Sequence, residues 1–196
     1  GLSDRELLAR GMEEEVRLGI QMGLDGFLLD FFALPESYGN PDEISNFNET
    51  SFALMDAAAR VDPGFKIIPA IYAGPKPPAR LSAVSNIDAR WTDAYAESPF
   101  TVRVLRHPQA FRLEDGRVLF SKWGTERYGA DWWIRAMDRL AGLGIPNAYL
   151  GQFTGLTKDR LAGYSTLCWA MADWGPRSPI DYHWVPRVRS LTTKAV

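Results

Sequence analysis

Several apolar runs of the chain end in side chains that can do chemistry. These side chains are Asp30, Tyr72, Lys122, Trp123, Gln152, Asp173 and Trp174. Ending a buried strand in such groups is costly unless they face a wet cleft. A carboxyl group there can transfer a proton or attack a substrate, so Asp30 and Asp173 are the candidate catalytic residues. The candidates for substrate binding are Tyr72, Lys122, Trp123, Gln152, Trp174 and Arg177.

Each of these residues also has a structural interpretation. Asp30 can cap or pair with a neighbouring strand end, and a lone lysine such as Lys122 usually extends to solvent. Tyr72 and Gln152 can line the rim without binding anything. Arg177 follows Asp173 closely enough to form a structural Asp–Arg clamp instead of a binding site.

The elements that position these residues alternate between strands and helices. Apolar runs predict strands over residues 26–32, 65–72, 118–123, 147–153 and 166–174. Helical spacing predicts helices over residues 3–23, 50–61, 89–96 and 130–144, a helix or loop over 158–163, and a loop from the first strand to about residue 48. A hairpin-like turn is predicted at Asp115 and Gly116. This alternation predicts an α/β fold with a parallel sheet, either doubly wound or a (β/α)8 barrel.

Composition excludes several classes of protein. The chain has 22 basic and 24 acidic residues, and no basic run, so we expect no nucleic-acid partner and no membrane-surface partner. No apolar stretch is long enough to span a bilayer. A single cysteine, Cys168, and the lack of metal-ligand spacing predict neither a disulfide nor a metal site. No glycine-rich phosphate motif follows a strand, and the oligomeric state stays open.

Four blocks of the sequence resemble glycoside hydrolase family 71 in its bacterial-type branch. They are "EEEVRLGIQMGLDGFLLD", "FALMDAAARVDPGFKIIP", "HPQAFRLEDGRVLFS" and "WGPRSP", and they occur in the family's order. The resemblance implies a (β/α)8 barrel that hydrolyses α-1,3-glucan with two acidic residues. It also implies a polysaccharide partner, no cofactor and an extracellular location.

The chain departs from the family in two places. Tyr72 stands where the family's strand ends in an aspartate, and no counterpart of the late "WNDYxE" block is present. We therefore interpret residues 1–196 as one incomplete TIM-barrel-type domain with about five βα units, against eight in a full barrel. In this interpretation Asp173, Trp174 and Arg177 contribute to a sugar-binding cleft, and the missing block would follow residue 196.

These departures leave the function open. We expect no turnover from these 196 residues by themselves, because the family's acidic block is absent. A non-catalytic carbohydrate-binding relative is the alternative. An unrelated βα enzyme that acts on another small polar substrate is a third, weaker possibility.

Overall fold

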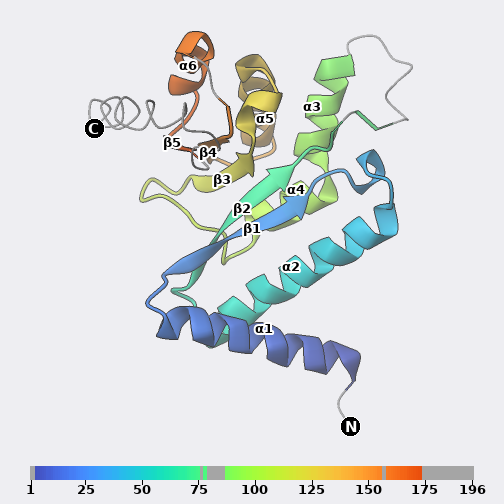
Figure 1. Cartoon of the computed structure of the whole chain (residues 1–196), viewed down its shortest axis with the longest axis vertical. Coiled ribbons are helices and arrows are strands. Elements are labelled where there is room, and N and C mark those ends of the chain that lie inside the picture. Colours follow the sequence, from blue (N-terminus) through green and yellow to red (C-terminus); the bar gives the residue numbers. More distant parts are fainter. Residues whose placement is uncertain (1–2, 76, 79–86, 156–157, 174–196) are drawn as a thin grey trace.

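Strands and helices alternate along the chain as the sequence predicts (Figure 1). The computed structural model describes residues 3–75, 77–78, 87–155 and 158–173; Trp174 and Arg177 lie outside these ranges. The strands are β1 Gly26–Phe32, β2 Lys66–Tyr72, β3 Val118–Trp123, β4 Asn147–Phe153 and β5 Ala170–Asp173. All five strands predicted from the sequence are confirmed, although the last begins later than its apolar run does.

Six helices and two short 3-10 turns connect the strands in the described part of the chain. The helices are α1 Asp4–Gln21, α2 Pro41–Val61, α3 Ile87–Glu97, α4 Pro99–Arg106, α5 Ala130–Gly142 and α6 Lys158–Ser165. The 3-10 turns are η1 Pro35–Ser37 and η3 Thr125–Arg127. Among the described helices, none combines the length and the apolar character that crossing a bilayer requires. The predicted turn before β3 is also confirmed, with Gly116 at a φ of 86°.

The loop predicted up to residue 48 is wrong, because α2 begins at Pro41. Asn40 caps the helix through a side-chain hydrogen bond from the Glu43 amide, and Pro41 occupies the first turn, where its missing N–H costs nothing. The polar residues that suggested a loop are therefore helical. One of them, Asn48, hydrogen-bonds the backbone at the end of β1.

The five strands form one parallel sheet in the order β1-β2-β3-β4-β5. A doubly wound sheet reverses its strand order at a switch point, and this sheet does not. The order is therefore consistent with part of a TIM-barrel-like fold, with β1 and β5 at the two edges of the described sheet.

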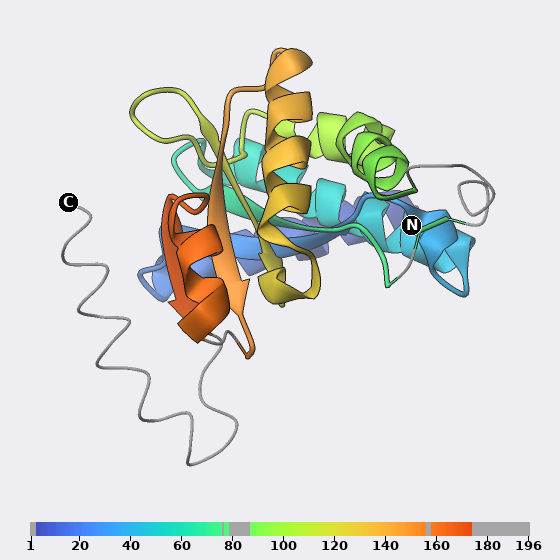
Figure 2. The same ribbon diagram turned by 90° about the horizontal axis from the view of Figure 1, so that it is seen from above.

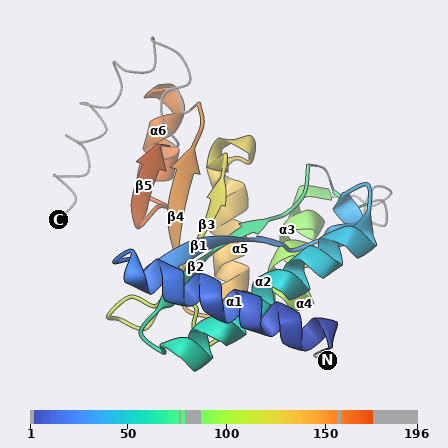
Figure 3. The same cartoon turned by 60° about the horizontal axis from the view of Figure 1, so that its bottom comes forward.

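Helices cover one face of this sheet. Phe31 of β1 packs on Phe52 of α2, and Tyr149 of β4 stacks on Trp133 of α5 at 4.5 Å. Figures 2 and 3 show α2 along β1 and α5 along β4. Alternate residues of a strand face opposite ways, so the intervening residues face away from the helices. This second face is the one that a barrel would enclose.

Pairing between β2 and β3 is limited to one register pair, Ala70 with Ser121. Pro69 has no N–H to donate to the neighbouring strand, which shortens the ladder at this point. Residues 109–111 fill the gap: the Ile67 amide donates to the Gln109 carbonyl at 2.8 Å, and the Phe111 amide donates to the Ile67 carbonyl at 2.7 Å. The two halves of the sheet are thus joined partly through this inserted segment.

Candidate active site at the carboxyl ends of the strands

Asp30 and Tyr72 form the centre of the site. Register pairing places Asp30 beside Ala70 and Phe32 beside Tyr72, so all four residues belong to the face away from the helices. The Tyr72 hydroxyl hydrogen-bonds the Asp30 carboxylate. Partial burial raises the pKa of Asp30, and the hydrogen bond from Tyr72 opposes that shift. A carboxyl group with a raised pKa is suited to donating a proton.

The Tyr72 hydroxyl connects three strands. It receives a hydrogen bond from the backbone of Trp123 on β3 while it binds Asp30 on β1. Burial, followed by the negative charge of Asp30, raises the pKa of Tyr72, so the phenol stays protonated and can act as a donor. The ring of Phe32 stacks on the Tyr72 ring at 5.4 Å and an interplanar angle of 28°.

Two residues of α2 hold the end of β1 in place. The Phe32 amide donates to Asn48 Oδ1 at 2.8 Å, and Asn48 Nδ2 donates to the Phe32 carbonyl at 2.8 Å. Ser51 Oγ donates to the Asp30 carbonyl at 3.1 Å. Asn48 is fully buried, so these hydrogen bonds satisfy backbone groups that an edge strand would otherwise leave unpaired.

Lys122 does not extend to solvent, contrary to one expectation from the sequence. It is only 2% exposed, and its Nζ donates to the carbonyls of Trp123 at 2.7 Å and Gly124 at 3.0 Å. Its register position belongs to the face that packs against the helices. Burial lowers the pKa of Lys122 to about 7, and the nearby Arg127 charge adds to that shift. Lys122 therefore lies beneath the rim and supports the backbone after β3.

Trp123 and Gln152 share the face of Asp30, as register pairing shows. Trp123 is partly exposed, and the Arg127 guanidinium lies 4.9 Å from its ring centre. Gln152 is buried, and its Nε2 donates to Ser121 Oγ at 2.7 Å. Trp123 can thus contact a ligand directly, whereas the amide nitrogen of Gln152 is engaged within the protein.

Three residues of this site were missed by the sequence analysis: Tyr38, Arg127 and Tyr128. The Tyr128 hydroxyl donates to the Gly74 carbonyl, and the Gly74 backbone hydrogen-bonds Tyr38. Burial raises the pKa of Tyr128 to about 12. Their position in short loops directly after β1 and β3 was the available signal, since such loops carry the sites of barrel folds.

The last strand, β5, ends at Asp173. The backbone of Asp173 pairs with Phe153 at the carboxyl end of β5, on the same edge of the sheet as Asp30. Trp174 and Arg177 follow outside the described residues, so their part in the cleft stays a prediction. Within the described ranges, no group of His, Cys, Asp and Glu residues has the arrangement of a metal site.

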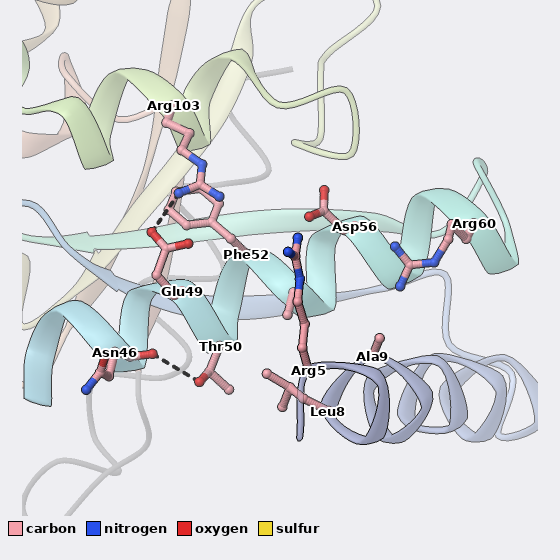
Figure 4. A pocket seen from close by; sticks show the side chains of 11 residues that line it. Arg5, Leu8, Ala9, Asn46, Glu49, Thr50, Phe52, Asp56, Arg60 and Arg103 are labelled. Atoms are coloured by element: carbon pink, nitrogen blue, oxygen red, sulfur yellow. Dashed lines mark hydrogen bonds and ion pairs between the residues drawn. The ribbon is translucent and has the colours of Figure 1, made fainter. Parts of the chain in front are cut away.

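A hollow of about 480 Å³ lies between α1, α2 and α4 (Figure 4). Two arginines of this hollow form ion pairs with glutamates: Arg103 binds Glu49 at 2.7 Å, and Arg60 binds Glu13 at 2.8 Å. The hollow lies among the outer helices, away from the strand ends. We therefore take the strand ends, and not this hollow, as the candidate site.

Comparison with known proteins finds a solved structure that shares the fold of this chain. No family model and no curated protein matches the chain. A solved structure described as "Glycoside hydrolase-like protein" superimposes on it with a TM-score of 0.61 at 10% sequence identity. The chain therefore shares the fold of that protein. The match covers 93% of this chain and 56% of that protein, so this chain spans little more than half of its length. Likeness at this identity concerns the fold, and membership of family 71 stays a prediction.

Proposed function

We propose that this protein is a glycoside hydrolase acting on α-1,3-glucan or a related polysaccharide. The observation that carries the proposal is the Asp30 carboxyl group, which has a raised pKa, binds Tyr72 and sits at a strand end of a glycoside hydrolase-like fold. The choice of α-1,3-glucan rests on the four sequence blocks that resemble family 71.

Asp30 is suited to the role of general acid in this reaction. Glycosidases need one carboxylic acid to protonate the departing glycosidic oxygen and a second carboxylate to attack carbon or activate water. Partial burial keeps a larger fraction of Asp30 protonated at a given pH. Tyr72, which stands where the family has an aspartate, orients the Asp30 carboxyl group through its hydroxyl.

Trp123 supplies a platform for the substrate. Its indole ring is partly exposed beside the Asp30–Tyr72 pair, and aromatic faces pack well on the apolar faces of sugar rings. Arg127 covers part of the ring and offers N–H donors to sugar hydroxyls. Asp173 pairs with Phe153, whose register position faces the helices, so we propose it as a subsite residue at the end of β5, together with Trp174 and Arg177, and not as the second acid.

One observation favours a second function, that of a non-catalytic carbohydrate-binding relative. Among the strand positions that the structure describes on the face away from the helices, Asp30 is the single carboxylate. A lone acid can bind sugar hydroxyls, but it cannot complete a two-carboxylate hydrolysis.

The test compares glucan binding with release of reducing ends by the full chain. Release that Asp30→Asn lowers by about 100-fold or more, and that Asp25→Asn leaves unchanged, supports the hydrolase. It would also overturn the expectation that these residues are inactive. Asp25 is a fair control because it is exposed and precedes the same strand at its opposite end. Binding without release supports the second function, and absence of both rejects the two together.

A further inference from the structure

A second hollow lies beside the candidate site, between the start of α3, η3 and the start of α5. Its volume is about 360 Å³, within the range of about 300–1,000 Å³ that is usual for small-molecule pockets. The residues that define its chemistry are Asp88, Arg127, Tyr128, Asp131, Trp132 and Arg135.

The charged side chains of this hollow are available to a ligand. Asp88, Arg127, Asp131 and Arg135 are exposed, and none of them forms an ion pair with another described residue. Two carboxylates and two guanidiniums cancel in charge, which disfavours a strongly charged ligand. Together they accept and donate hydrogen bonds, as the hydroxyl groups of a neutral sugar require.

Trp132 provides an independent observation. Its side chain is 8% exposed and lines the hollow, yet its indole Nε1 is buried without a hydrogen-bond partner in the described part of the chain. This nitrogen is closed to a ligand, so what Trp132 offers to the hollow is its aromatic ring, a surface suited to packing on a sugar. Tyr128 stacks on the Trp132 ring at 4.6 Å, which fixes the indole in place.

Two residues form a shared wall between this hollow and the candidate site. Tyr128 lines the hollow, and its ring lies 4.9 Å from the Lys122 ammonium beneath the rim. Arg127 also lines the hollow, and its guanidinium lies 4.9 Å from the Trp123 ring. A polymer that lies over Trp123 therefore needs only to pass Arg127 to reach the hollow.

We propose that this hollow is a distal subsite, which binds one neutral hexose unit of a polysaccharide whose other units lie over Trp123. The proposal rests on the proposed function, because it assumes that the strand-end site binds a glycan. Arg135 and Asp131 hydrogen-bond the sugar hydroxyls at the outer side of the hollow, and the Trp132 ring forms part of its inner wall.

Titration calorimetry with α-1,3-linked glucose oligosaccharides tests the proposal. The probes are the disaccharide, which is too short to span both sites, and the hexasaccharide, which can span them. In the full chain, Arg135→Ala should weaken binding of the hexasaccharide about tenfold, the size expected for one hydrogen bond to a charged group. Binding of the disaccharide at the strand ends should not change. Arg10→Ala is the matched control, since Arg10 is exposed on α1, far from the hollow in the sequence.

Each other outcome has a distinct meaning. If Trp123→Ala weakens the hexasaccharide but Arg135→Ala and Arg10→Ala both bind it like the unaltered chain, the distal subsite is rejected and the proposed function stands. If the unaltered chain binds neither oligosaccharide, the proposed function fails and takes the subsite with it. Asp131→Ala is a second variant of the same exposed rim and should reproduce the effect of Arg135→Ala.

Discussion

The hydroxyl of Tyr72 binds the carboxylate of Asp30 across two neighbouring parallel strands, and the same hydroxyl receives a hydrogen bond from the backbone of Trp123 on the next strand. One phenol thereby orients a carboxyl group and opposes the increase in its pKa that burial causes. Because the hydrogen bond favours the charged form of Asp30 while burial favours the neutral form, the pKa of Asp30 is a balance that single substitutions can shift.

Removing the phenolic hydroxyl should raise the pKa of Asp30. In Tyr72→Phe the hydrogen bond that stabilises the carboxylate is lost, whereas most of the burial remains. Carbon-13 NMR titration of the Asp30 carboxyl group should show a midpoint at higher pH than in the unaltered chain. Tyr38→Phe serves as the control, because it leaves the Asp30–Tyr72 hydrogen bond in place. A midpoint that falls, or that stays the same, would contradict this account.

Replacing the carboxyl group itself should stabilise the fold at neutral pH. The pKa of Asp30 is higher in the folded state than in the unfolded state, so the folded state binds more protons and loses stability as the pH rises through that interval. Asp30→Asn removes the buried charge. The melting temperature should therefore rise at pH 7 and change much less at pH 4. Asp25→Asn, at an exposed position, should leave both melting temperatures close to their original values.

Lys122 should make stability depend on pH in the opposite direction. Its pKa of about 7 lies below the value of an unfolded lysine, so between these values the unfolded chain binds more protons. The free energy of unfolding should rise from pH 7 to pH 9.5 with a slope of up to about 1.4 kcal/mol per pH unit. Lys122→Met should remove this rise in urea denaturation experiments.

The control for this pH effect is a lysine on the neighbouring strand. Lys66→Met alters β2, where the Lys66 ammonium donates to the Pro108 carbonyl at 3.3 Å and is not sealed inside the fold. It should keep the rise between pH 7 and pH 9.5. Equal slopes in the Lys122→Met variant and the unaltered chain would show that Lys122 stays charged in the folded protein.

A glycine at the start of β1 should tolerate no side chain. A Cβ at Gly26 would lie 1.9 Å from the Lys66 carbonyl oxygen on the paired strand. Gly26→Ala should therefore cost about 3 kcal/mol or more of unfolding free energy, because the two backbones must separate. Gly11→Ala, in the middle of α1 with nothing within 4 Å of the new Cβ, should instead gain about 1 kcal/mol. Similar effects of the two substitutions would argue against the close pairing of β1 and β2.

The strands could be predicted from the sequence because buried parallel strands are apolar on both faces. The same property hid which face each residue occupies, and Lys122 was placed beside Trp123 although neighbouring residues of a strand point in opposite directions. The proximity of Asp30, Tyr72 and Trp123 could be predicted because parallel strands present their carboxyl ends at one edge. Tyr128 and Arg127 were missed because a loop carries no periodic pattern.

Helix α2 shows how a polar residue can mislead a prediction. Asn48 lay in the segment predicted as a loop, and it is polar because it binds the backbone of β1, a partner that is distant in the sequence. Only the three-dimensional structure brings them together. The start of α2 was nevertheless readable: Asn40, Pro41 and Glu43 are residues that begin helices.

The contact between Asn48 and Phe32 also limits what can be added to the sheet. Both backbone groups of Phe32 that face the open edge of β1 are already bonded to one buried amide, and Ser51 occupies the carbonyl of Asp30. Any strand that joins β1 from outside, whether from the same polypeptide or from an aggregating neighbour, can pair only before this point. Association along this edge therefore stops short of Asp30 and Phe32, and the end of β1 that carries the candidate site stays open even when the sheet grows.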